Sequence, residues 1–99
     1  MKVLPELIAY RDRLMTKAAD WPDQPVEDLI AALGRCREQM RLLESALADL
    51  RAHPAKVGEP AGEDPRREHR ISVQEQTRQL TAAYAEALRR HLDGRAVRG

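Results

Sequence analysis

Apolar residues recur at alternating steps of three and four between Pro25 and about Ala52. This spacing places them on one face of an α-helix, and four consecutive heptads have an apolar residue at both core positions. The a positions are Val26, Leu33, Met40 and Leu47, and the d positions are Leu29, Cys36, Leu43 and Leu50. The pattern predicts a long, coiled-coil-like helix that must pack against other helices, because a continuous leucine stripe would otherwise face water.

An amphipathic pattern over residues 5–19 predicts a shorter helix before it, with Pro5 in the first turn, where a missing N–H costs nothing. Two prolines lie between Asp20 and the second helix and prevent one helix from running into the next. So short a connection predicts an antiparallel hairpin. We expect Trp21, at the bend, to close the end of the core; the alternative is an anchor for recognition of a partner.

Residues 72–93 carry a thinner apolar stripe that predicts a third helix. The segment from Ser72 to Glu75 has the form of a capping box, and Gly94 suits a left-handed cap at the other end. Before this helix, residues 54–70 are rich in proline and glycine and predict a flexible linker. The expected organisation is an all-α fold with a hairpin (1–53), a linker (54–70) and a third helix with a basic tail (71–99).

The predicted hairpin is lopsided. At 1.5 Å per residue the first helix spans about 22 Å and the second about 42 Å, so the first covers the apolar seam only from Val26 to about Met40. The remainder needs the third helix of the same chain or a second copy, which would complete a three-helix bundle or a homodimer. The residues predicted to contact a partner are Met40, Leu42, Leu43, Leu47 and Leu50.

The composition favours helices and does not indicate a partner that is bound through the overall charge of the chain. The chain has 99 residues, 33% of them charged, a net charge of +1 and only 3% aromatic residues. Such a core of leucines and smaller aliphatics suits helices, and the balanced charge does not indicate bulk attraction to nucleic acid or a membrane surface. Residues 21–53 sum to −2 and residues 71–99 to +2, which predicts weak attraction between the hairpin and the third helix.

The single cysteine excludes an internal disulfide and favours a reducing, cytoplasmic setting. No apolar run approaches the length of a membrane span, and the N-terminus lacks the apolar segment of a secretion signal.

Catalytic chemistry has no recognisable parts in this sequence. The three histidines have no partner at metal-ligand spacing, there is no glycine-rich phosphate loop, and the serines have no recognisable base. We therefore expect no catalytic residues, no metal, no cofactor and no small-molecule substrate.

Three interpretations of function remain. The leading one is a non-enzymatic protein–protein interaction or oligomerisation module. The first alternative is a small inhibitor or accessory protein, of the kind that phages and mobile elements encode, which occludes a larger host complex. The second is a nucleic-acid-associated regulator, for which the candidate phosphate or acidic-partner contacts are Arg66, Arg67, Arg70, Arg89 and Arg90.

Overall fold

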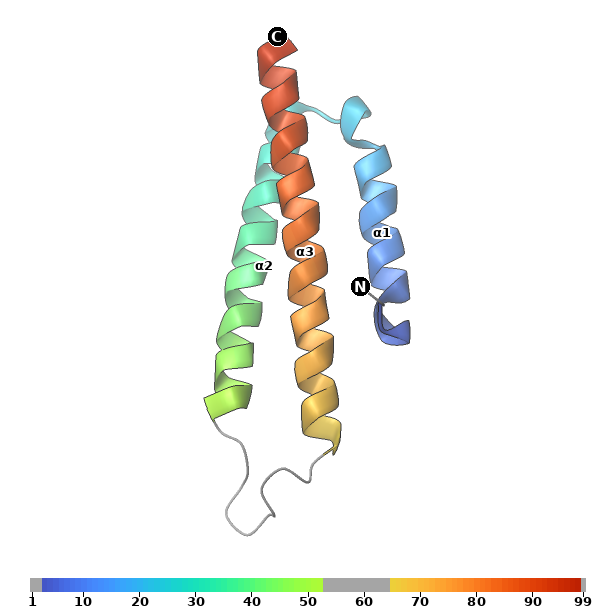
Figure 1. The fold of residues 1–99 in the computed structure, drawn as a ribbon. Coiled ribbons are helices and arrows are strands. Elements are labelled where there is room, and N and C mark those ends of the chain that lie inside the picture. The colour runs from blue at the N-terminus through green and yellow to red at the C-terminus, as the bar shows by residue number, and fades with distance from the viewer. Residues whose placement is uncertain (1–2, 53–64, 99) are drawn as a thin grey trace.

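The computed structural model describes residues 3–52 and 65–98, which form three α-helices in an elongated bundle (Figure 1). The principal extents are 61 × 23 × 17 Å. Within the described residues there is no strand. The prediction of an all-α fold is confirmed.

The first two helices begin and end close to the predicted residues. A 3₁₀ turn, η1 (Pro5–Leu7), leads into α1 (Ile8–Ala19), and a second one, η2 (Trp21–Asp23), forms the bend before α2 (Val26–Ala52). Pro5 and Pro22 each occupy an early position of a 3₁₀ turn, where proline loses no hydrogen bond. The prolines therefore determine where these elements start, as predicted.

The third helix is longer than predicted. Helix α3 (Pro65–Arg98) has 34 residues, so it begins seven residues before Ser72 and continues through Gly94. The predicted capping box and glycine cap are wrong, and residues 65–70 belong to the helix rather than to a linker. Proline is favoured at the first helical position, and Glu68 in the first turn suits the positive end of the helix dipole. The rest of the predicted linker, residues 54–64, lies outside the described residues.

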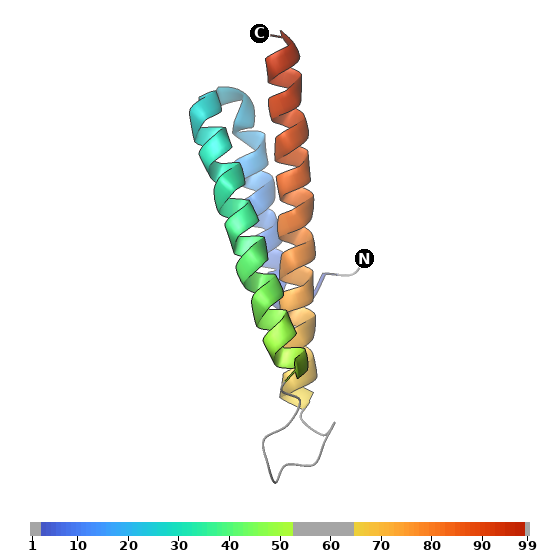
Figure 2. The same cartoon turned by 90° about the vertical axis from the view of Figure 1, so that its left-hand side faces the viewer.

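Helix α3 is the element on which both other helices pack. Helix α2 runs antiparallel along α3 for most of its length, whereas α1 contacts α3 and makes little direct contact with α2. Figure 2 shows α1 and α2 on the same side of α3. The prediction that α1 covers the seam from Val26 to Met40 is therefore wrong, because Leu29 and Leu33 pack against α3 and Val26 is 37% exposed.

The hydrophobic core lies at the end of the bundle where η2 turns the chain, which we call the hairpin end. Its buried members come from η2, α2 and α3: Trp21, Leu29, Leu33, Ala85 and Leu88. Leu88 is fully buried. The prediction that Trp21 closes the end of the core is confirmed, since only 8% of it is exposed.

Candidate functional site

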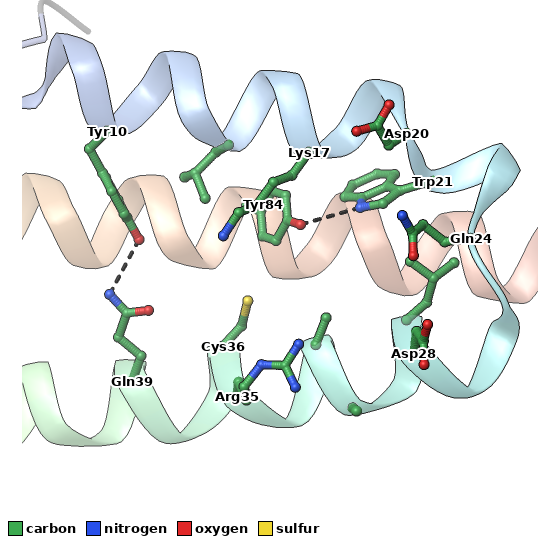
Figure 3. Close-up of a pocket in the computed structure, with 14 residues that line it drawn as sticks. Tyr10, Lys17, Asp20, Trp21, Gln24, Asp28, Arg35, Cys36, Gln39 and Tyr84 are labelled. Carbon is green, nitrogen blue, oxygen red and sulfur yellow. Dashed lines mark hydrogen bonds between the residues drawn. The ribbon is translucent and has the colours of Figure 1, made fainter.

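A groove runs between α1 and α2, with α3 behind it (Figure 3). Its volume is about 510 Å³, which lies within the 300–1,000 Å³ typical of binding sites. We call it the α1/α2 groove. On α2 it extends from Asp28 to Gln39, about 16 Å at the rise of an α-helix.

The floor of the groove is apolar and its rim is polar. Trp21 and Leu29 are buried, Tyr84 is half-buried, and all three line the groove. The rim carries exposed side chains from both walls, including Lys17 of α1 and Arg35 of α2. A desolvated floor inside a polar rim is the usual anatomy of a protein-binding surface.

All three aromatic residues of the chain line this groove. Trp21 is the single tryptophan, and Tyr10 and Tyr84 are the only tyrosines. The Trp21 and Tyr84 rings lie 5.2 Å apart between centroids, and the indole Nε1 donates a hydrogen bond to the Tyr84 hydroxyl at 3.3 Å. Tryptophan and tyrosine dominate binding energies at protein interfaces because each presents a large rigid surface with a polar handle.

A chain of hydrogen bonds ties the three helices together at the other end of the groove. Thr81, which is fully buried, donates its only hydroxyl proton to the Thr77 carbonyl at 2.7 Å. The Tyr10 hydroxyl is 2.5 Å from the Thr81 Oγ1 and must therefore be the donor of that bond. Gln39 Nε2 in turn donates to the Tyr10 hydroxyl at 3.3 Å, which bridges the two walls (Figure 3).

The bend at the hairpin end is held by α3. Arg95 donates from Nη1 to the backbone carbonyls of Trp21, at 3.4 Å, and Gln24, at 2.7 Å. The His91 ring lies 5.5 Å from the Trp21 ring between centroids. These contacts fix the bend to the last turns of α3, so the groove has a defined shape at this end.

Four charged side chains line the groove: Lys17, Asp20, Asp28 and Arg35. The two carboxylates lie toward the hairpin end, and the two cations lie nearer its middle (Figure 3). Cys36 lies on the α2 wall as a free thiol, and burial raises the pKa of this thiol. The groove thus offers an apolar floor, hydrogen-bonding groups and an ordered set of charges.

The structure places the predicted partner-contact residues outside this groove. Leu47 is only 3% exposed and Met40, Leu43 and Leu50 are half-buried, because α3 lies along this part of α2. Leu42 is 55% exposed. A partner could therefore reach Leu47 only if α3 moved away.

The candidate phosphate contacts are all on α3, but they do not form one patch. Arg89 and Arg90 both bond to Glu86, and Arg89 also reaches Asp93. Arg67 donates to the Leu50 carbonyl at 2.6 Å, near the opposite end of the helix from Arg89. Arg66 and Arg70 also have interactions within the protein. A phosphate would have to compete with these partners.

In residues 3–52 and 65–98, no three His, Cys, Asp or Glu side chains are placed to hold a metal ion. Over the same ranges no helix combines the length and the apolar character needed to cross a membrane. Comparison with protein-family models, with curated proteins and with solved structures found no match.

The groove is not predicted from the sequence, because Trp21 is expected chiefly to close the core, and Tyr10 and Tyr84 are each expected only in the apolar stripe of their own helix. The one local signal is that the chain has only three aromatic residues, and all three line the groove. Their convergence depends on pairing α1 and η2 with α3 across more than 60 residues of sequence, which no local pattern reveals.

Proposed function

We propose that this protein is a non-enzymatic interaction module that binds a helical segment of a partner protein in the α1/α2 groove. The observation that carries the proposal is that α1 and α2 both pack on α3 but scarcely on each other, which leaves the aromatic-lined groove between them. A fourth helix laid there would complete a four-helix bundle.

The spacing of the groove residues suits a helix as occupant. On α1 the groove is lined by Tyr10, Leu14 and Lys17, and on α2 by Ala32, Arg35 and Gln39, at steps of three and four in each case. Two walls with helical periodicity match the i, i+3, i+4 and i+7 positions of an amphipathic helix. A length of about 16 Å accommodates about three turns.

A selection experiment tests the proposal. A displayed library of 15-residue helical peptides, with their apolar face randomised among aliphatic residues, is selected on the folded protein. Binding is then measured by Trp21 fluorescence, since the single indole lies on the groove floor. We expect binders whose affinity falls by about tenfold or more, equivalent to about 1.4 kcal/mol, when Ala31→Tyr fills the mouth of the groove.

Ala48→Tyr is the matched control. Ala31 and Ala48 are both exposed on α2, but only Ala31 lines the groove. Ala48→Tyr should bind the selected peptides like the wild type. Binders that tolerate Ala31→Tyr, or a selection that yields no binder at all, would contradict the proposal.

A further inference from the structure

The order of charges along the α1/α2 groove carries a second inference, which rests on the proposed function. Asp20 and Asp28 both line the groove near the hairpin end, Asp20 at the end of α1 and Asp28 on α2. Lys17 precedes Asp20 by one helical turn, and Arg35 follows Asp28 by two turns, so both cations lie farther from the bend. The groove is thus acidic at one end and basic toward its middle.

None of these four side chains forms an ion pair within the described part of the chain, whereas several arginines elsewhere on the surface do. Arg41 is paired with Glu38, Arg78 with Glu44, and Arg89 with Glu86. The groove charges therefore remain available to a ligand. Complementary charge at a rim chiefly sets register and orientation rather than affinity.

We propose that the groove selects an amphipathic helix that presents a basic and an acidic side chain four or seven residues apart on one face, and that these charges fix the direction in which the helix lies. The spacing follows from the one-turn and two-turn separations on the two walls. The basic group of the ligand lies between Asp20 and Asp28, and the acidic group lies between Lys17 and Arg35.

A helix with the basic residue first must then enter with its N-terminus at the hairpin end, and a helix with the acidic residue first must lie the other way round. Direction is therefore the quantity to measure, because either charge order can satisfy the groove by reversing the helix. Affinity alone would not separate the two arrangements.

The probes are two hydrocarbon-stapled 15-residue peptides with the same leucine face, one with Lys seven residues before Glu and one with these two residues exchanged, so that both charges lie on the face that meets the groove. Each carries a nitroxide spin label at its N-terminus. In NMR spectra of the full chain, the Trp21 indole N–H reports the hairpin end and the Gln39 side-chain amide reports the opposite end. We expect the Lys-first peptide to broaden the Trp21 signal and the Glu-first peptide to broaden the Gln39 signal.

The fourfold exchange Lys17→Asp, Asp20→Lys, Asp28→Arg, Arg35→Asp keeps the net charge but places both cations at the hairpin end and both carboxylates nearer the middle, so it should reverse both results. A peptide with Lys at both positions should bind about three- to tenfold more weakly than the Lys-first peptide, as expected for two rim ion pairs. Equal broadening of both reporters by both peptides would overturn the charge rule and leave groove binding standing. Absence of any chemical-shift change in groove residues would overturn the proposed function itself.

Discussion

The leucines of α2 are packed differently at the two ends of the α2–α3 pair. At the hairpin end, Leu29 and Leu33 of α2 pack in one cluster with Ala85 and Leu88 of α3. At the other end, which we call the distal end and which comprises residues 43–52 and 65–78, Leu47 is equally well buried but lies outside that cluster. The seam is continuous on α2, and the difference comes from α3.

Polar side chains dominate the part of α3 at the distal end. Its half-buried residues are Arg67, Ile71, Val73, Gln74, Glu75, Gln76, Thr77 and Arg78. Two buried polar atoms there, Arg67 Nε and Gln74 Oε1, have no hydrogen-bond partner, compared with one, His91 Nε2, at the hairpin end. Each such atom costs about 1 to 3 kcal/mol. The comparison shows that a regular apolar seam predicts which face is covered but not how favourably it is covered.

The largest expected effect comes from truncating the leucines at the two ends. Leu88→Ala should lower the free energy of unfolding by about 3 to 5 kcal/mol, because it leaves a cavity among apolar neighbours, and Leu47→Ala should lower it by only about 2 kcal/mol. Urea denaturation followed by circular dichroism at 222 nm gives both values. If Leu47→Ala proves as costly as Leu88→Ala, the two ends are equally well packed and the comparison fails.

Removing an unpaired polar atom should strengthen the distal end. Gln74→Met keeps a similar shape and eliminates the buried Oε1, so we expect the free energy of unfolding to rise by about 1 to 2 kcal/mol. The matched control is Gln79→Met, because Gln79 is exposed on the same helix and should change stability by less than about 0.5 kcal/mol. A loss of stability in Gln74→Met would show that the amide makes a favourable interaction.

The sequence predicts α1 and α2 well because prolines and a regular apolar period act locally. Pro5 and Pro25 mark the helix starts, and the seam residues carry the period without interruption. Helix α3 is harder to predict, since most of its half-buried residues before Leu80 are polar, with Ile71 and Val73 as the apolar exceptions. Pro65 and the arginines after it resemble a linker in composition, although proline is also the residue that most readily begins a helix.

The groove, and the way in which the leucines of the distal end are covered, depend on packing between helices that no local sequence pattern predicts. The predicted first helix is too short to cover Leu43, Leu47 and Leu50, and the sequence leaves open whether the third helix or a second copy covers them. In the structure α3 begins at Pro65, so it lies along this part of α2, and Leu47 is only 3% exposed. The added length of α3 is the part that the capping-box signal at Ser72 did not predict.

A smaller effect is expected between the two ends, at the hydrogen-bond chain through Tyr10 and Thr81. Thr81→Val should lower the free energy of unfolding by about 1 to 2 kcal/mol, because it removes the acceptor for the Tyr10 hydroxyl and the donor to the Thr77 carbonyl. Combined with Tyr10→Phe, the losses should be non-additive by about 0.5 kcal/mol or more. Strict additivity would mean that the two hydroxyls do not act together.

The smallest effect separates the ends by their dependence on salt. At the distal end α2 and α3 are linked by ion pairs between Arg51 and Glu75 and between Glu44 and Arg78, while the hairpin-end pairs of Glu86 with Arg89 and Arg90 stay within α3. All these groups are at least partly exposed, so each interhelical pair contributes about 0 to 1 kcal/mol and weakens as salt screens it. Raising sodium chloride from 0.05 to 0.5 M should therefore speed amide hydrogen exchange in residues 43–52 and 65–78 about two- to fivefold relative to residues 26–36 and 81–92.

Glu75→Gln should abolish part of that difference, whereas Glu86→Gln, which removes pairs within one helix, should leave it unchanged. Uniform acceleration along both helices would show that the ion pairs do not distinguish the two ends, and that the apolar core alone determines where the bundle opens.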